Sequence, residues 1–325
     1  MNYTQIISTD NPALVIIAID QSGSMMGPFT NHSMIVSKSE IASMIASAII
    51  DEMIFRSRHH GVLHRYFDFS VLGYSRQDIY PLVNSTLHPA PITVLDGITP
   101  TIKRRTIEHL TTDNHLFLTL ESYSEWFVPQ AAGITPMVDM FDTVAEIASE
   151  WCNNQQNKDS FPPIIINITD GLDSTEYNKH LLEKSEAIKQ IGTSDGKSLI
   201  FNIYIDSTPL SERHNFPNID TIAAECNILP LATISSTLPE LFHPLAREYN
   251  PTVAPDYRAL CYNAVGLNII PSLNLWCKLF KNRSLVQIYP IILRPVIREA
   301  NCKIFSHIEA VLDSSDNGIS HAIKH

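Results

Sequence analysis

The sequence has little positive charge, scattered cysteines and no long apolar run, and each shortage excludes a class of protein. The net charge is -11 at pH 7 and no basic cluster extends beyond residues 103–105, so the chain offers little attraction to the phosphates of a nucleic acid. The first apolar run, residues 13–19, is too short for a membrane span or an export signal, and no positively charged segment precedes it. We therefore expect a cytoplasmic protein that binds neither nucleic acid nor a membrane.

Motifs that mark common metal and enzyme sites are also missing. The cysteines form no C-x-x-C pair, so neither a zinc site nor a disulfide framework is predicted, and we expect buried thiols. The sequence contains neither the G-x-x-x-x-G-K-[ST] motif of P-loop nucleotide enzymes nor the G-x-S-x-G motif of serine hydrolases. These two enzyme classes are therefore excluded.

Short apolar runs rich in Val and Ile alternate with longer amphipathic stretches along most of the chain. This alternation is typical of a parallel sheet whose two faces are both covered by helices. The predicted strands are residues 13–19, 66–73, 164–169, 199–205 and 228–234. The predicted helices are residues 37–58, 135–154, 174–192 and 236–249. The expected class is therefore α/β, with a doubly wound, mostly parallel central sheet flanked by helices.

Two regions depart from this alternation. Residues 77–130 are dominated by proline, threonine and aromatic residues, with a strand-like segment, HLFLTLESY, near their end. We expect them to form an inserted lobe or hairpin that contributes to specificity. Residues 251–325 begin with several prolines and end in a polar segment that we expect to be frayed. We therefore predict one domain over residues 1–250, with this insertion, and a C-terminal extension over residues 251–325 that packs partly on it.

Two aromatic residues at the end of the insertion, Trp126 and Phe127, have two interpretations. Exposed aromatic side chains often anchor a protein partner. The alternative is that both residues pack the insertion onto the sheet.

Polar residues follow the first predicted strand without any spacer. The segment IIAIDQSGSM places Asp20, Ser22 and Ser24 directly after that strand. Thr135 lies in AAGITPM just before a predicted helix, and Asp170 lies in IIINITDGLD just after another strand. Ligands of parallel α/β sheets gather beyond the carboxyl ends of the strands, so these five oxygen-bearing side chains can converge there. The alternative is a turn whose Asp and Ser side chains satisfy only their own backbone.

Two carboxylates and three hydroxyls suit a hard divalent cation. Mg²⁺ prefers oxygen ligands in near-octahedral geometry, so these five predicted ligands leave at least one position open. Mn²⁺ and Ca²⁺ are the alternatives. Because the hydroxyls are neutral, the ion keeps enough positive charge to bind an acidic group from outside. The predicted partner is therefore a protein that supplies an Asp or Glu carboxylate.

The pattern D-x-S-x-S at Asp20, Ser22 and Ser24, with Thr135 in G-x-T-P and Asp170 in T-D-G, resembles the metal-ion-dependent adhesion site of von Willebrand factor A domains. The resemblance covers about residues 13–250 and implies a Rossmann-like fold. It also implies that the two serines are direct ligands, that the threonine is a ligand in one conformational state, and that the aspartates bind directly or through water. The insertion makes the segment between Ser24 and Thr135 longer than in compact members of the family.

A narrower resemblance is carried by the segments VLGYSR, WFVPQAAGITPM, FPPIIINITDG, TSDGKSLIFN and LPELFHPLAREYNP. They are similar to bacterial cytoplasmic von Willebrand A proteins associated with tellurite-resistance gene sets and with PP2C-type phosphatase and kinase partners. This resemblance implies an intracellular scaffold for signalling or stress response, with a phosphatase or kinase of this type as its partner.

The rival interpretation is a Mg²⁺-dependent phosphatase of the haloacid-dehalogenase type. Such enzymes also begin with an apolar strand that ends in Asp, and they bind Mg²⁺ near an aspartate pair, which Asp170 and Asp173 loosely mimic. The chemistry needs a nucleophilic carboxylate and, two residues later, a carboxyl group that acts as general acid and base. Position 22 is Ser, whose hydroxyl does not exchange protons near neutral pH. We therefore expect a binding protein with no catalytic residues rather than an enzyme.

Overall fold

The computed structural model describes residues 3–262, apart from 32–33, 111–115, 172–174, 207–214, 223–227 and 251–255. The chain forms two units, residues 1–280 and 281–325, and every described residue belongs to the first. Most of the predicted extension at residues 251–325 lies outside the described residues. The boundary at residue 250 stays a prediction.

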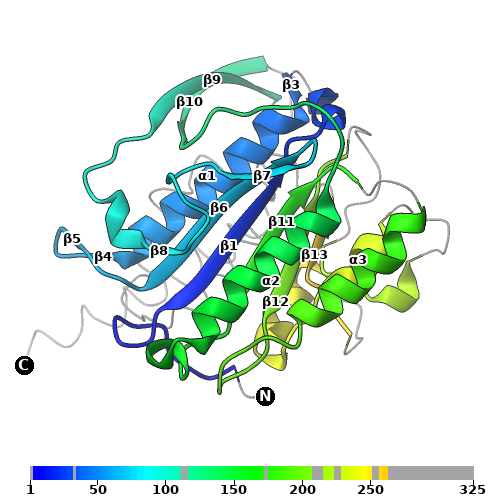
Figure 1. Cartoon of the computed structure of the whole chain (residues 1–325). Coiled ribbons are helices and arrows are strands. Elements are labelled where there is room, and N and C mark those ends of the chain that lie inside the picture. Colours follow the sequence, from blue (N-terminus) through cyan, green and yellow to red (C-terminus); the bar gives the residue numbers. More distant parts are fainter. Residues whose placement is uncertain are drawn as a thin grey trace, which may run out of the picture. The chain divides into compact units, whose positions relative to one another are not determined.

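A mixed, mostly parallel sheet forms the centre of the first unit (Figure 1). Its strand order is β13-β12-β11-β1-β6-β7, and β8 also pairs with β6. The first five strands in this order are parallel to one another, whereas β7 and β8 run antiparallel to β6. The bounds are β1 (Ala13–Asp20), β6 (Phe67–Ser75), β7 (Asp78–Pro81), β8 (Ala90–Pro91), β11 (Ile164–Thr169), β12 (Leu199–Tyr204) and β13 (Leu260–Tyr262).

Helices cover both faces of this sheet, with α1 on one side and α2 and α3 on the other (Figure 1). Along β1, Val15 and Ile17 belong to the core on the α1 side, and Leu14 and Ile16 belong to the core on the α2 side. A strand that is buried on both faces has no polar positions, which is why its sequence reads as one apolar run. The predicted α/β class is confirmed, in an arrangement compatible with a doubly wound fold. The helices are α1 (Lys38–Ser57), α2 (Met137–Asn153), α3 (Thr175–Ile188), α4 (Leu229–Ile234) and α5 (His243–Tyr249).

The start of α1 is fixed by a capping box. The Ser37 hydroxyl accepts a hydrogen bond from the Glu40 backbone N–H at 3.2 Å, and the Ser37 backbone N–H donates to the Glu40 carboxylate at 2.8 Å. This pair satisfies two of the backbone N–H groups that a helix start leaves without partners. Lys38 is therefore held as the first residue of the helix.

The prediction of a strand over residues 228–234 is wrong, because this segment forms helix α4. A short apolar run fits a buried strand and a buried helix equally well by periodicity. Pro230 lies within the first turn, where the missing N–H has no helical partner to lose, and Leu231, Ala232 and Ile234 are buried. The fifth parallel strand is β13, which pairs with β12 at the edge of the sheet.

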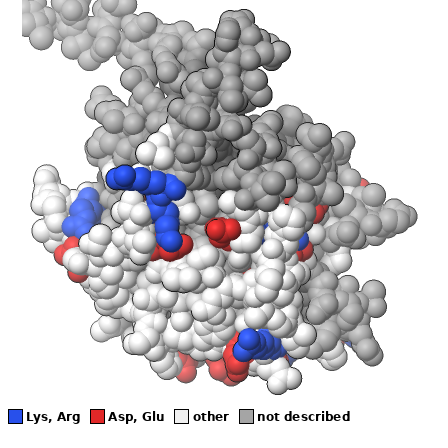
Figure 2. Space-filling view, turned by 90° about the horizontal axis from the view of Figure 1, so that it is seen from above, with Lys and Arg blue, Asp and Glu red and all other residues white. Residues whose placement is uncertain are grey.

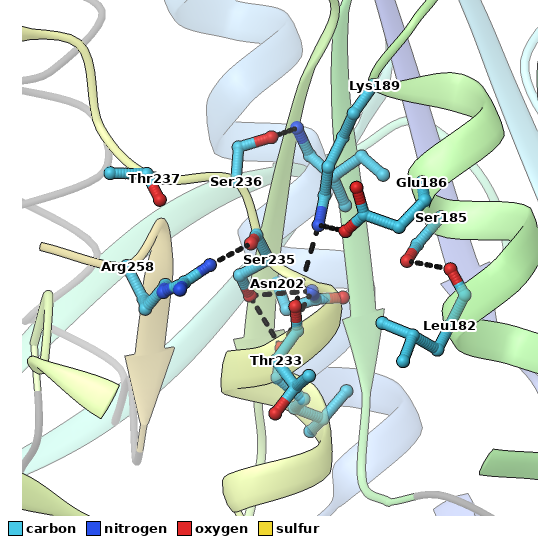
Figure 3. Close-up of polar contacts among 12 residues, drawn as sticks. Leu182, Ser185, Glu186, Lys189, Asn202, Thr233, Ser235, Ser236, Thr237 and Arg258 are labelled. Atoms are coloured by element: carbon cyan, nitrogen blue, oxygen red, sulfur yellow. Dashed lines mark hydrogen bonds and ion pairs between the residues drawn. The ribbon is translucent and has the colours of Figure 1, made fainter. Parts of the chain in front are cut away.

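Side-chain hydrogen bonds attach the residues after α4 to β12 (Figure 3). The Asn202 amide donates to the Ser235 hydroxyl at 2.9 Å, and the Ile200 backbone N–H donates to the Ser236 hydroxyl at 2.9 Å. Lys189, just beyond α3, donates to the Glu186 carboxylate at 2.9 Å and to the Thr233 carbonyl oxygen at 3.5 Å. These bonds replace the strand pairing that the sequence had suggested for this segment.

The insertion at residues 77–130 supplies edge strands β7 and β8 and then a long hairpin that lies against α1 (Figure 1). The hairpin strands are β9 (Thr101–Leu110) and β10 (Leu116–Glu125). Directly after them, the Trp126 indole donates to the Asp51 carboxylate of α1 at 2.8 Å, and Phe127 is buried. Both aromatic residues therefore pack the end of the insertion onto the domain, mainly through α1.

The remaining described elements are short. They connect the main helices and strands and include the turn that follows β1. Their bounds are η1 (Gly23–Met26), β2 (Pro28–Asn31), β3 (Met34–Ser37), β4 (Arg58–His59), β5 (Val62–Leu63), η2 (Ile92–Leu95), η3 (Gln155–Asn157), η4 (Ile219–Thr221) and η5 (Glu240–Phe242).

Two of the cysteines and all the helices named above lie in the described part of the chain, where the expectations of buried thiols and of no membrane span apply to them. Within the part of the chain that the structure describes, no helix combines the length and apolar character needed to span a bilayer. Cys152 is half-buried and Cys261 is buried, and these two described cysteines form no disulfide bond. Burial raises the pKa of Cys152 to about 12. The other cysteines lie outside the described residues.

Candidate functional site

The ends of β1 and β11 bring two aspartates to the same edge of the sheet. The strands are parallel neighbours, with Ile19 opposite Ile168, so Asp20 and Asp170 leave the sheet side by side. Thr169, the last residue of β11, donates a hydrogen bond from its hydroxyl to Asp20 Oδ2 at 2.7 Å. The sequence prediction that these strand ends meet is thus realised through the pairing of β1 with β11.

The loop after β1 links these aspartates through two serine hydroxyls. Asp20 Oδ1 accepts a hydrogen bond from the Ser22 backbone N–H at 2.9 Å. Ser22 Oγ lies 3.0 Å from Ser24 Oγ, and Ser24 Oγ donates to Asp170 Oδ1 at 2.7 Å. The ammonium of Lys38 donates to Asp170 Oδ2, also at 2.7 Å. We call this group the edge cluster, and its members are Asp20, Ser22, Ser24, Lys38, Thr169 and Asp170.

Thr135 lies beside the edge cluster, in a loop that is hydrogen-bonded to the loop after β1. The Gly23 N–H donates to the Gly133 carbonyl oxygen at 2.8 Å, and the Ala132 N–H donates to the Gln21 carbonyl oxygen at 2.7 Å. Among the described residues, the Thr135 hydroxyl is not joined by a hydrogen bond to the other predicted ligands. The structure therefore joins four of the five predicted ligands by hydrogen bonds. The fifth, Thr135, lies alongside because the backbone of its loop is hydrogen-bonded to the loop after β1.

Gly133 is required for the contact between these loops. Its φ of +79° lies in the left-handed region, and a Cβ built on it would lie 2.4 Å from Cγ of Arg76. The Arg76 N–H donates to the Ile134 carbonyl oxygen at 2.9 Å, which places the turn after β6 against the same loop. Only glycine combines this backbone conformation with so close an approach. The loop that carries Thr135 is thus fixed from two sides.

Burial controls the electrostatics of the edge cluster. Asp20 is 0% exposed, and this burial raises the pKa of its carboxyl to about 6, although hydrogen bonds from Ser22 and Thr169 act to lower it. The nearby Asp170 carboxylate raises the same pKa further. Among the described residues, Lys38 pairs with Asp170, and no basic side chain pairs with Asp20. The cluster therefore holds two carboxylates against one ammonium, which favours the arrival of another cation.

The donor set of the edge cluster is of the kind that a hard divalent cation prefers, because it consists of carboxylate and hydroxyl oxygen atoms. In the structure these oxygen atoms are joined by hydrogen bonds, at 3.0 Å between Ser22 Oγ and Ser24 Oγ and at 2.7 Å between Ser24 Oγ and Asp170 Oδ1. No three His, Cys, Asp or Glu side chains gather as a metal-holding group in the described part of the chain. A site here would therefore combine carboxylates with hydroxyls.

Sequence reasoning missed two members of the edge cluster. Thr169 is the first residue of the T-D-G motif, and its hydroxyl, next to Asp170 in the sequence, could have indicated a further member of the site. Lys38 gave no signal, because it belongs to a helix and lies 132 residues from Asp170 along the chain. Asp173, the second aspartate of the phosphatase alternative, lies outside the described residues.

The surface at this end of the sheet carries few charges. Figure 2 views the molecule from above Figure 1, the end at which β1 terminates, and shows basic groups that lie beside acidic ones on a largely uncharged described surface. Met26, in η1, is 66% exposed, and Ile134, next to Thr135, is 52% exposed, whereas Met25 is buried. The edge cluster thus has apolar side chains on its exposed flanks.

Comparisons with known proteins add no assignment. The chain matches no protein-family model and no curated protein. Among the solved structures that match is one described as an uncharacterized membrane spanning protein from Vibrio fischeri, with 13% sequence identity, coverage of 59% of this chain and 71% of that chain, and a TM-score of 0.25. A likeness at this TM-score supports no statement about fold or function. Functional inference therefore depends on the residues of this chain.

Proposed function

We propose that this chain is a metal-dependent protein-interaction module of the von Willebrand factor A type. The observation that carries the proposal is the hydrogen-bonded edge cluster, in which Ser22 and Ser24 link the aspartates at the ends of two adjacent parallel strands. The D-x-S-x-S, G-x-T-P and T-D-G motifs of the sequence support the same assignment by their resemblance to that family's adhesion site.

The residues that would hold the ion are the five predicted ligands. Mg²⁺, or Mn²⁺ or Ca²⁺ in its place, would supply a positive charge with an open coordination position. The role of the chain is to hold hard oxygen atoms together at the surface end of the sheet, where Asp20 and Ser22 are buried and Ser24 is exposed. We propose that an Asp or Glu carboxylate of a protein partner completes the coordination.

The flanks of the edge cluster indicate further chemistry of this partner. Met26 and Ile134 are exposed apolar side chains on the segments that carry Ser24 and Thr135. Apolar contacts around a polar contact exclude water from it and thereby strengthen it. The proposed ligand is therefore an acidic residue with apolar neighbours.

The narrower resemblance supports a cellular setting. We propose a cytoplasmic scaffold for signalling or stress response in bacteria, with a PP2C-type phosphatase or a kinase as its partner. The phosphatase alternative for the chain itself gains no support, because Ser22 occupies the position of the general acid and its hydroxyl lies against Ser24 rather than supplying a carboxyl group.

Calorimetric titration of the full chain with Mn²⁺ tests the metal site. We expect wild type to bind one ion and Asp20→Ala to lose affinity by about a hundredfold or more, since a metal ligand is removed. The matched control is Asp142→Ala, because Asp142 is 47% exposed and forms an ion pair with Lys184 at 2.6 Å between α2 and α3. If wild type binds no divalent ion, or if both variants bind like wild type, the metal site is refuted.

A peptide-display selection on the metal-loaded chain tests the partner chemistry. Selected peptides should share an Asp or Glu with apolar neighbours, and replacing that residue by Asn or Gln should abolish binding. Chelation of the metal with EDTA should abolish it equally. Peptides that bind in EDTA as well as in Mg²⁺ would show that the interaction does not use the metal.

A further inference from the structure

The ammonium of Lys38 already occupies one side of the predicted metal site. Its Nζ donates to Asp170 Oδ2 at 2.7 Å, and the side chains are only 12% and 4% exposed. The other carboxylate oxygen of Asp170 accepts the hydrogen bond from Ser24. Both oxygen atoms of this predicted ligand are therefore already in use by groups of the chain itself.

Backbone hydrogen bonds join Lys38 to the turn that carries Ser24, and its side chain passes beside Gly27. The Lys38 N–H donates to the Gly27 carbonyl oxygen at 3.0 Å, and the Gly27 N–H donates to the Ser24 carbonyl oxygen at 2.9 Å. A Cβ built on Gly27 would lie 3.5 Å from Lys38 Cε and 3.8 Å from Nζ. The lysine side chain thus runs along the bare face of Gly27 to reach Asp170, on the same turn that carries Ser24.

We propose that the Lys38 ammonium is an internal cation that competes with the divalent ion for Asp170. This inference rests on the proposed function. A metal ion held by Ser24 and Asp170 would lie close to the ammonium, and repulsion between like charges is strong where water is excluded. Binding of the divalent ion therefore requires the ion pair between Lys38 and Asp170 to break.

This competition has two consequences for the interaction module. Without metal, Lys38 neutralises a carboxylate that is almost fully buried, so the loop stays folded. With metal, the extra positive charge weakens ion binding until a partner carboxylate adds a negative charge. Metal and partner are then coupled, since each raises the affinity of the chain for the other.

Two substitutions separate the charge of Lys38 from its packing. Lys38→Met removes the ammonium, and Lys38→Gln keeps a hydrogen-bond donor for Asp170 without the charge. We expect both to bind Mn²⁺ about tenfold more tightly than wild type in calorimetry, a typical size for coupling between two binding events. Lys38→Arg, which keeps the charge, should stay close to wild type, as should the control Lys184→Met in the exposed ion pair with Asp142.

Thermal unfolding of the full chain gives a second readout. In EDTA, Lys38→Met should unfold at a lower temperature than wild type, because Asp170 loses its cation. Saturating Mn²⁺ should then raise the melting temperature of Lys38→Met by more than that of wild type.

The outcomes distinguish the two proposals. The competition is overturned if Lys38→Met and Lys38→Gln bind Mn²⁺ no more tightly than wild type. If Asp20→Ala still loses affinity in the same experiment, the proposed metal site is retained. Absence of Mn²⁺ binding in wild type and in all variants overturns both.

Discussion

Two polar clusters lie on strands of the same sheet, and they meet where Tyr74 contacts Thr169. The two clusters differ in charge. The edge cluster contains two carboxylates and one ammonium at the carboxyl ends of β1 and β11. The second, which we call the strand cluster, lies within the sheet and contains only neutral groups. Its members are Tyr74, Asn167, Asn202 and Ser235.

The hydrogen bonds of the strand cluster form one continuous chain. The Tyr74 hydroxyl donates to Asn167 Oδ1 at 2.7 Å, and Asn167 Nδ2 donates to Asn202 Oδ1 at 2.9 Å. Asn202 Nδ2 then donates to the Ser235 hydroxyl at 2.9 Å, which donates to the Leu231 carbonyl oxygen at 2.7 Å (Figure 3 shows the Asn202 end). Each group thus has a partner of the opposite kind, which is how buried polar groups avoid a desolvation cost.

The difference shows how the proposed metal site departs from a structural polar cluster. In the strand cluster donors match acceptors and no charge remains. In the edge cluster burial raises the pKa of Asp20, because its charged form has no cationic partner among the described residues. A cation bound beside Asp20 would offset this desolvation cost, whereas the strand cluster contains no charge for a cation to offset.

The largest expected effect comes from Asp20→Asn, which changes the charge of the edge cluster while keeping its shape. Binding of Mn²⁺ should weaken by about a hundredfold or more, since a carboxylate ligand is lost. Calorimetry at pH 7.5 measures this effect.

The same variant should not lose stability in EDTA. The raised pKa of Asp20, about 6 against 3.8, means that the folded state binds the proton more tightly than the unfolded state. The free energy of unfolding therefore falls as pH rises from 3.8 to about 6, because the charged carboxylate is less stable in the folded state. At pH 7.5 Asp20 is charged, and the fold carries the whole of this destabilisation. Asn has no such cost, so urea denaturation should show a gain of about 1–3 kcal/mol. A clear loss of stability would mean that the Asp20 carboxylate is compensated in the folded protein.

The next largest effect comes from Asn202→Leu in the strand cluster. The substitution removes the oxygen acceptor of the buried Asn167 Nδ2 group and the donor to the Ser235 hydroxyl, so the free energy of unfolding should fall by about 2–4 kcal/mol. Urea denaturation measures this change, and Asn153→Leu, at the exposed end of α2, is the control. Affinity for Mn²⁺ should stay within about twofold of wild type. A comparable loss of metal affinity would show that the edge cluster depends on the strand cluster, with which it is in contact through Tyr74 and Thr169.

The smallest effect concerns the loop that carries Thr135. Gly133→Ala adds a Cβ that would meet Arg76, whereas Gly97→Ala, at a similar φ of +80°, meets no atom within 4 Å. The left-handed strain of about 1–2 kcal/mol is common to both variants, so their difference isolates the contact with Arg76. We expect Gly133→Ala to have the lower melting temperature and the weaker Mn²⁺ affinity. Equal values for the two variants would show that the loop contact is dispensable.

Much of the fold could be predicted because local pattern and burial agree. The apolar runs at β1, β6, β11 and β12 and the longer segments at α1, α2 and α3 form the elements that their sequence patterns predicted. The predicted ligands were found because strand ends in a parallel sheet lie at one edge, which follows from connectivity alone. Their binding of a metal stays a prediction.

Other features could not be predicted because they depend on packing between distant segments. The segment at α4 became a helix because its apolar residues pack on β12 beside Ser235, and the edge strand β13 is too short to show a pattern. Tertiary structure alone placed the Lys38 ammonium on Asp170, because a long side chain can reach many places and the sequence does not show which acidic group 132 residues away lies within its reach. The sequence by itself determined which oxygen-bearing side chains meet at the end of the sheet, through strand order, and only the tertiary structure decided which cation of the chain lies among them.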